Sequence, residues 1–181
     1  CIRDSHFAFY GGAHAEAYYM IRDTNGVWSD YETIAEYAGT HALAVDPAGN
    51  PHLMIKQTRN NYEKVYYHFE KTNGAWAEPE FITRIDNQCT ENAKPKLAAI
   101  GNGVLHAAFR CNDDLRYTAR TNEKWTTPFP ISSGASIDNY PYLGLEIDDI
   151  GNLFLIDETR FQKWTDADTD TDGINDFNCL L

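Results

Sequence analysis

The sequence predicts an all-β protein built as an array of about four antiparallel units, each with four short strands. The first observation is a recurring phrase, Thr-Asn-Gly-Val-Trp, Thr-Asn-Gly-Ala-Trp and Thr-Asn-Glu-Lys-Trp, whose tryptophans Trp28, Trp76 and Trp125 lie 48 and 49 residues apart. A fixed period of about 20–50 residues marks a repeat architecture. The second is that a tyrosine-rich, alternating segment precedes each phrase, as expected of a strand. The third is composition: 181 residues with 43% hydrophobic content and no helical pattern indicate one folded domain.

Each unit opens with a strand, a turn rich in Gly, Asn or Asp, and a second alternating strand, which is the pattern of a β-hairpin. This opening covers residues 41–55, 95–109 and 142–156, whereas the first unit begins at its second strand, residues 6–10. The predicted third strands are residues 17–20, 65–69 and 115–118, and the predicted fourth strands end in residues 32–34, 80–82 and 129–131.

The recurring phrase is the expected turn between the third and fourth strands. Asn-Gly is the strongest two-residue hairpin signal, because both positions tolerate positive φ. The third copy has Asn122-Glu123 instead, so its turn is expected to differ or to be strained.

A unit of four short antiparallel strands in 46 to 54 residues describes the blade of a β-propeller. We expect a β-propeller-like domain over residues 1–165, followed by a calcium-binding tail over residues 166–181. The first and last blades are incomplete, and the blades cover approximately residues 5–35, 41–83, 95–132 and 141–165.

Two recurring side chains have more than one interpretation. His6, His52 and His106 fall at one repeat position, where the fourth unit has Phe154. We favour hydrogen bonds to the backbone of a neighbouring blade over metal binding, because equivalent positions sit on different blades. The tryptophans are expected to pack between blades, with a carbohydrate-stacking platform as the alternative.

The charge of the chain excludes some partners. A net charge of −12 and a pI near 4.8 disfavour nucleic acid and anionic lipid, which need a basic surface. No stretch approaches the roughly 18 apolar residues of a membrane-spanning helix. Part of the acidic charge lies in one C-terminal run, which favours cation binding.

Four cysteines with wide spacing and no Cys-x-x-Cys pair favour two disulfides in an oxidising compartment. The first hairpin of the third unit turns near Asn102, which brings Cys89 within reach of Cys111. Cys1 then pairs with Cys179 or with another chain. A lipid anchor at Cys1 is the alternative that we do not favour.

The units Ala-Val-Asp-Pro-Ala-Gly-Asn-Pro-His (residues 44–52) and the tyrosine-rich hairpin of residues 65–82 resemble the repeats of secreted bacterial β-propellers of the sialidase-like (BNR-type) superfamily. The resemblance covers roughly residues 5–165 and implies the propeller fold. It does not imply sialidase activity, because residues 23–28 miss the Gly-to-Trp spacing of the Asp-box and the eight arginines show no recognisable triad.

The tail from residue 166 to residue 176 has aspartates at alternate positions and a glycine in register. It resembles the calcium loops of thrombospondin type 3 and dockerin-like repeats. Calcium takes six to eight oxygen ligands at about 2.3–2.6 Å, and a glycine allows the loop to turn around the ion. We expect a structural Ca²⁺ ion in this loop. Cys179 occupies the position at which an EF-hand has its bidentate glutamate. A further ligand, such as Asp166, water or the surface of the last blade, is therefore needed. The predicted ligands are Asp168, Asp170, Asp172, the carbonyl of Ile174, and Asp176.

These features predict a non-catalytic, calcium-binding module that is secreted, periplasmic or on a bacterial-type cell surface, and that binds a glycan or a protein. Candidate ligand-binding aromatic residues are Tyr140, Tyr142 and Trp164, where the repeat is least regular. The alternative is a structural subunit of an extracellular filament or larger complex, assembled through exposed strand edges. A sialidase-type glycoside hydrolase is the least favoured function.

Overall fold

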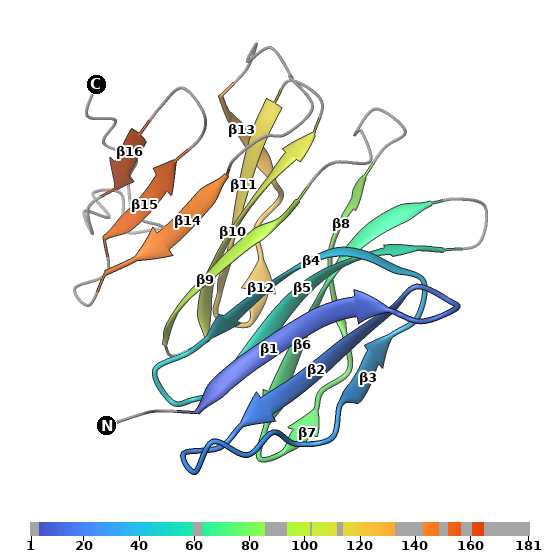
Figure 1. Cartoon of the computed structure of the whole chain (residues 1–181). Helices are drawn as coiled ribbons and strands as arrows, with labels where there is room; N and C mark the ends of the chain where they lie inside the picture. The colour runs from blue at the N-terminus through green and yellow to red at the C-terminus, as the bar shows by residue number, and fades with distance from the viewer. Residues whose placement is uncertain are drawn as a thin grey trace.

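The computed structural model describes residues 4–59, 63–85, 94–101, 103–111, 114–132, 143–148, 152–156 and 161–164. These residues form sixteen strands and no helix, arranged in four separate antiparallel sheets that follow one another along the chain (Figure 1). The predicted all-β class and the antiparallel pairing are therefore confirmed.

We number the sheets in chain order. Sheet 1 contains β1 (Ser5–Gly11), β2 (Glu16–Arg22) and β3 (Glu32–Ala35). Sheet 2 contains β4 (Ala38–Val45), β5 (Pro51–Thr58), β6 (Lys64–Thr72), β7 (Ala75–Trp76) and β8 (Glu80–Ile85). Sheet 3 contains β9 (Lys96–Gly101), β10 (Val104–Cys111), β11 (Asp114–Thr121), β12 (Lys124–Trp125) and β13 (Phe129–Ser132). Sheet 4 contains β14 (Gly144–Ile147), β15 (Leu153–Ile156) and β16 (Phe161–Trp164).

The predicted four-stranded unit differs from the observed sheets at its outer strand. In sheets 2 and 3 this strand is divided, because β7 and β8 both pair with β6, and β12 and β13 both pair with β11. Pro79 and Pro128 lie in the two interruptions. Proline has no N–H to donate to a ladder, so the strand breaks there and resumes beyond it.

The recurring turn takes two forms. Asn73 and Gly74 have φ of 52° and 80°, and Asn122 and Glu123 have φ of 49° and 61°. Both pairs therefore form the same two-residue turn with positive φ, and the third copy is strained at Glu123 rather than different.

The first copy of the phrase has one more residue in its turn. Trp28 pairs with Arg22, whereas Trp76 pairs with Lys71, which lies one residue closer along the chain. The Asp23 carboxylate accepts hydrogen bonds from the backbone N–H groups of Asn25 and Val27 at 2.9 and 2.8 Å. This side-chain capping stabilises the longer turn.

Three hydrophobic cores lie between consecutive sheets. The alternation of side chains along a strand places Leu53 and Ile55 against Tyr19 of sheet 1, while Met54 packs with Phe109 of sheet 3. A third core joins sheet 3 to sheet 4 around Leu145 and Leu155. Sheets 2 and 3 are thus buried on both faces.

The first strands of the sheets lie side by side. β1 contacts β4, β4 contacts β9, and β9 contacts β14. The described residues do not close into a ring, so a complete propeller is not observed and the four sheets form an open stack.

Candidate functional site

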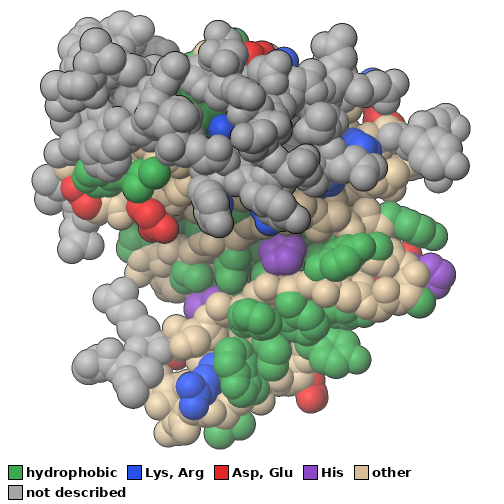
Figure 2. Space-filling model, turned by 45° about the horizontal axis from the view of Figure 1, so that its top comes forward, with side chains coloured by type: hydrophobic (Ala, Val, Ile, Leu, Met, Phe, Trp, Pro, Cys, Tyr) green, Lys and Arg blue, Asp and Glu red, His purple; other side chains and the backbone are tan. Residues whose placement is uncertain are grey.

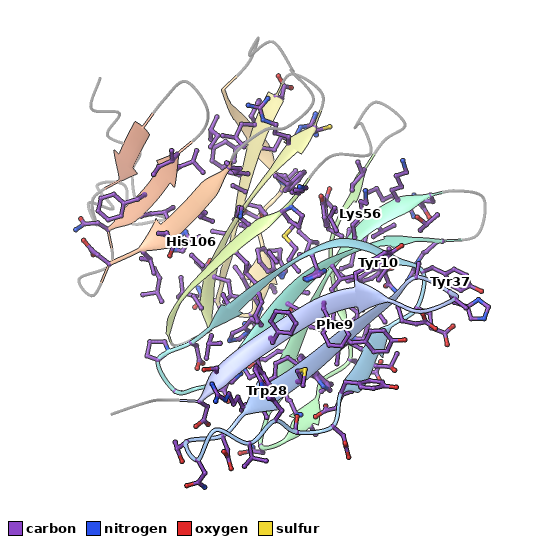
Figure 3. All side chains as sticks on the ribbon, viewed as in Figure 1. Phe9, Tyr10, Trp28, Tyr37, Lys56 and His106 are labelled. Carbon is purple, nitrogen blue, oxygen red and sulfur yellow. The ribbon has the colours of Figure 1, made fainter. Side chains whose placement is uncertain are left out.

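A cleft of about 720 Å³ lies where the ends of β1, β4, β5, β6 and β9 meet. It draws residues from sheets 1, 2 and 3, which makes it a property of the stack rather than of one repeat. Figure 3 shows Tyr10, Tyr37 and Lys56 at this end of the molecule. The lining residues are Tyr10, Ala15, Tyr37, Ala38, Gly39, Thr40, His41, Lys56, Thr58, Lys64, Lys94, Pro95 and Lys96.

The rim of the cleft is built from strained turns held by backbone hydrogen bonds. Ala15 and Tyr37 have φ of 58° and 52°, which side chains other than glycine rarely adopt. The Tyr37 N–H donates to the His14 carbonyl, and the Thr58 N–H donates to the Tyr37 carbonyl, at 3.1 and 3.0 Å. These bonds fix the exposed ring of Tyr37 between the β1–β2 turn and the end of β5. Backbone strain of this kind is retained where surrounding structure imposes it.

Four lysines give the cleft a positive charge. Lys56 is 7% exposed, and its stem lies so close to Gly39 that a Cβ there would stand 2.8 Å from its Cε. Lys64 and Lys96 are half-buried and Lys94 is exposed. None of the lining residues, all of which are described, is acidic, although the whole chain has 27 acidic residues and a net charge of −12. A positive lining of this kind favours the approach of an anion.

Two polar contacts hold β4 beside the cleft, one to sheet 1 and one within sheet 2. His41 Nε2 lies 3.2 Å from the Ala8 carbonyl on β1, and the Thr40 side chain forms a hydrogen bond with Tyr66. The first contact corrects the expectation for the recurring histidines, since the bond to a neighbouring sheet's backbone comes from His41.

The recurring histidines instead contact the next strand of their own sheet. His6 Nδ1 lies 2.6 Å from the Tyr19 hydroxyl, and His106 Nδ1 lies 2.5 Å from the Tyr117 hydroxyl. His52 Nδ1 makes the equivalent contact with His68 Nε2 at 3.1 Å. A diagonal neighbour in the same antiparallel pair is close enough for such contacts, so no second blade is required.

A buried polar network continues from the His52–His68 pair. His68 Nδ1 lies 3.1 Å from Glu80, and Arg120 of sheet 3 donates two hydrogen bonds to that carboxylate at 2.8 and 2.6 Å. Burial raises the pKa of Glu80, but the hydrogen bonds from His68 and Arg120 outweigh it and lower the pKa to about 2. Burial and the neighbouring His68 lower the pKa of His52. The network therefore connects sheets 2 and 3 electrostatically.

His52, His68 and Glu70 are the described residues whose ligand atoms come close enough to hold a metal ion. Arg120 already lies 3.8 Å from Glu70, and the facing nitrogens of the two histidines form a hydrogen bond with each other. Because Arg120 already lies beside Glu70 and the two histidines already bond to each other, we assign these residues a structural role.

Two of the three tryptophans in the recurring phrase pack between sheets as predicted. Trp76 contacts Tyr19 of sheet 1 with ring centroids 5.2 Å apart, and Trp125 contacts His68 of sheet 2 at 5.6 Å. Trp28 is different, because its side chain is 45% exposed on sheet 1.

Most predicted site residues lie outside the described part of the chain. These are the calcium ligands Asp168, Asp170, Asp172, Ile174 and Asp176, together with Tyr140, Tyr142 and Cys89. Trp164 ends β16, of whose side chains nothing is described, and Cys111 is buried at the end of β10. The calcium loop, the aromatic site and the Cys89–Cys111 disulfide therefore stay predictions.

The cleft itself was not predicted. Its four lysines are spread over residues 56–96 of a strongly acidic chain, and none belongs to a motif. A comparison of equivalent repeat positions would not have found it either, because its residues come from three different sheets.

No protein-family model and no curated protein matches the sequence. Among solved structures, a polysaccharide lyase of family PL25, an ulvan lyase, aligns with a TM-score of 0.43 and 11% identity over 89% of this chain. A mutant of NanB sialidase from Streptococcus pneumoniae aligns with a TM-score of 0.49 and 12% identity over 86% of this chain. The chain spans 51% of the lyase and 26% of the sialidase. At these values the likeness is confined to a β-rich architecture and assigns no activity or residue.

The described residues contain no helix with the length and apolar character needed to cross a membrane.

Proposed function

We propose that this chain is a non-catalytic carbohydrate-binding module and that the cleft between sheets 1, 2 and 3 holds an acidic glycan. The observation that supports the proposal best is the lining of the cleft, with four lysines, no acidic residue and two exposed tyrosines on its rim. Tyr10 and Tyr37 are 55% and 57% exposed.

The chemistry of these groups suits a chain of acidic sugars. An ammonium group forms charge-assisted hydrogen bonds with carboxylate or sulfate oxygens. A tyrosine ring offers an apolar face to the C–H face of a sugar and a hydroxyl to its polar edge. Lys56 is held by burial before any ligand arrives, so less side-chain entropy is lost on binding.

Titration calorimetry with a uronic-acid oligosaccharide and a neutral oligosaccharide of the same length tests the proposal. We expect binding of the acidic oligosaccharide alone, weakening as ionic strength rises. The double variant Lys94→Gln/Lys96→Gln is expected to weaken binding at least about tenfold, because each hydrogen bond to a charged group contributes about 1.5–3 kcal/mol.

The matched control is Lys124→Gln, which removes the same charge from an exposed residue on β12, outside the cleft. Equal loss of affinity in this control, or equal affinity for the neutral oligosaccharide, would count against a site in the cleft. Release of shorter or unsaturated products from the acidic oligosaccharide would show that the module is an enzyme.

The finer architecture and location are part of the same proposal. The open stack with adjacent first strands supports a propeller-like arrangement of blades. The acidic tail supports structural calcium, and the predicted disulfide and calcium both suit a secreted or cell-surface protein.

A structural subunit assembled through strand edges is the alternative function. The described outer strands give it less support, because β3 and β13 have four residues each and Pro79 and Pro128 interrupt the outer strands of sheets 2 and 3. Short edges and prolines disfavour pairing with another strand. A sialidase-type hydrolase has no specific observation in its favour.

A further inference from the structure

Sheet 2 differs from its neighbours at the residue that contacts the recurring histidine. This residue is Tyr19 in sheet 1 and Tyr117 in sheet 3, but it is His68 in sheet 2. A tyrosine hydroxyl can both donate and accept a hydrogen bond, so it satisfies either tautomer of its histidine. A second imidazole is less adaptable, because each of its nitrogens either donates or accepts.

The residue directly opposite the recurring histidine differs as well. It is Ile21 in sheet 1 and Ala119 in sheet 3, but it is Glu70 in sheet 2. This position lies two residues after the first one, so both side chains point to the same face of the strand. Sheet 2 therefore has a histidine and a glutamate where the other two sheets have a tyrosine and an apolar residue. Imidazole nitrogen and carboxylate oxygen are both ligands of zinc.

The contacts of this cluster need more protons than two neutral histidines supply. Arg120 donates two hydrogen bonds to the ionised carboxylate of Glu80, which can only accept from His68 Nδ1 at 3.1 Å. With its proton on Nδ1, neutral His68 has a lone pair on Nε2. His52 must then donate from its Nδ1 to that lone pair across 3.1 Å. The Nε2 atom of His52 is therefore left without a proton.

This second nitrogen of His52 is buried beside another acceptor. His52 is 0% exposed, and its Nε2 has no hydrogen-bond partner among the described residues. A carboxylate oxygen of Asp46 lies 3.7 Å away. Two hydrogen bonds from Asn50, at 2.7 and 3.0 Å, hold that carboxylate in place. A buried acceptor that faces a carboxylate lowers stability, because neither group has a proton to share.

A metal ion bound to the two facing nitrogens would remove this mismatch. A histidine that binds a metal through one ring nitrogen donates the other N–H, commonly to a carboxylate. His52 would then donate from Nε2 toward Asp46, and His68 would keep its bond from Nδ1 to Glu80. Two ligands of a tetrahedral zinc ion lie about 3.3 Å apart when each bond is about 2.0–2.1 Å long. The facing nitrogens, at 3.1 Å, are already close to that separation.

Glu70 supplies a third ligand and a route from solvent. A ligand atom of its carboxylate lies within 4.8 Å of those of both histidines, and its side chain is 24% exposed. Arg120 lies 3.8 Å from this carboxylate, which is longer than a hydrogen bond. Three carboxylates and one guanidinium surround the histidine pair. A divalent ion would balance their charges.

We propose that His52, His68 and Glu70 bind one Zn²⁺ ion, with water as the fourth ligand, on the face of sheet 2 that is turned toward sheet 3. The structural role of this cluster is then that of a metal centre. Trp125 of sheet 3 contacts the His68 ring at 5.6 Å, so the ion would strengthen the contact between the two sheets. Other histidine side chains are visible at the surface in Figure 2, whereas this pair is 0% and 1% exposed. The cleft contains none of the three residues, so the zinc site does not depend on glycan binding.

Titration calorimetry of the chelator-treated protein with Zn²⁺ tests the proposal. Excess Ca²⁺ is present throughout, because it occupies sites made of oxygen ligands alone, such as the predicted loop in the tail. We expect one Zn²⁺ per chain and a higher melting temperature with the ion. His68→Tyr/Glu70→Ala should fold and lose the ion, since it gives sheet 2 the residues that sheet 3 has at these positions. Glu70→Gln should weaken binding at least about tenfold, the lower limit for loss of an outer partner of a metal ligand.

The matched control is His14→Gln, which removes an exposed histidine outside the cluster and should leave the affinity for Zn²⁺ unchanged. Circular dichroism checks that each variant retains its fold. Absence of zinc binding by the unaltered chain would overturn the proposal. Unchanged affinity in the double variant or in Glu70→Gln would also overturn it, because the ion would then lie elsewhere. An equal loss of affinity in His14→Gln would point to the same conclusion.

Discussion

His106 Nδ1 and the Tyr117 hydroxyl lie 2.5 Å apart on neighbouring strands, and the same diagonal contact recurs between His6 and Tyr19 at 2.6 Å. In sheets 1, 2 and 3 the histidine contacts the residue two places before its direct cross-strand partner. In sheet 2 that residue is His68. The repeat therefore preserves a polar contact inside each sheet, beside the apolar cores between sheets.

Acid should destabilise the protein through His106. Burial lowers the pKa of His106 from 6.5 to about 4. The unfolded chain therefore binds the proton of His106 more tightly than the folded chain does. The folded state has its full stability above pH 6.5, where His106 is neutral in both states, and loses stability as the pH falls toward 4. The loss is on the order of 3 kcal/mol. Urea unfolding across this pH range should show a smaller acid-induced loss in the free energy of unfolding for His106→Phe. Phenylalanine is chosen because Phe154 occupies the equivalent position in sheet 4. An equal loss in the variant would assign the titration to other groups.

The order of the elements could be predicted from the sequence because its signals are local. Asn73-Gly74 determines a hairpin without help from the rest of the chain, and the alternation around Leu53 and Ile55 indicates a strand buried on that face. The division of the outer strands has only one local signal, the prolines Pro79 and Pro128.

The cleft and the histidine contacts depend on information that is not local. Lys56 and Lys96 line one cleft only because β9 begins at the side of the stack where β5 ends. The partner of His106 depends on the register between β10 and β11. The alternation of side chains does not determine this register, because a shift of two residues keeps every side chain on the same face. The net charge of −12 describes the whole chain and does not reveal a cleft whose own lining is cationic.

Glu123 should be replaceable by glycine with a gain in stability. Its φ of 61° is the same turn position that Gly74 occupies at 80° in sheet 2. Relief of the strain should outweigh the greater backbone entropy of glycine in the unfolded chain, giving a net gain of roughly 1 kcal/mol in the free energy of unfolding. The reciprocal change Gly74→Glu should cost a similar amount, because a Cβ there meets no atom within 4 Å and only backbone strain is added. Denaturant titrations of both variants measure the effect, and a loss in Glu123→Gly would contradict it.

Arg120 should stabilise the contact between sheets 2 and 3. Its guanidinium forms two hydrogen bonds with Glu80, and its side chain is 6% exposed. Arg120→Ala would leave Glu80 near Glu70 without a cation, at a cost of roughly 2 kcal/mol, less than for a fully buried pair because Glu80 is partly exposed. Arg120→Lys should recover only part of this, since an ammonium group cannot reproduce the two parallel bonds.

The control for Arg120 is an exposed ion pair of the same residue types. Arg84 lies 2.9 Å from Glu63 but is 73% exposed, so Arg84→Ala should change stability by no more than about 0.5 kcal/mol. Acid unfolding adds a second measurement. The pKa of Glu80 is lowered to about 2, so its contribution is present above pH 4.5 and is lost as the pH falls toward 2. Arg120→Ala should reduce that acid dependence, whereas an unchanged profile would show that Arg120 does not hold the Glu80 carboxylate.

Calcium should raise the melting temperature through the C-terminal run. The aspartates from Asp168 to Asp176 lie outside the described residues, so this prediction rests on their spacing and on the repulsion among crowded carboxylates. If the bound tail orders against the last sheet, free calcium at 100 times its dissociation constant should add about 2.7 kcal/mol to the free energy of unfolding. Calorimetry with added calcium and with excess chelator measures the difference. The double variant Asp170→Asn/Asp172→Asn should lose the response, because two of the charged ligands become neutral while their size is retained. The same melting temperature with calcium and with chelator would show that the run is a solvated acidic tail.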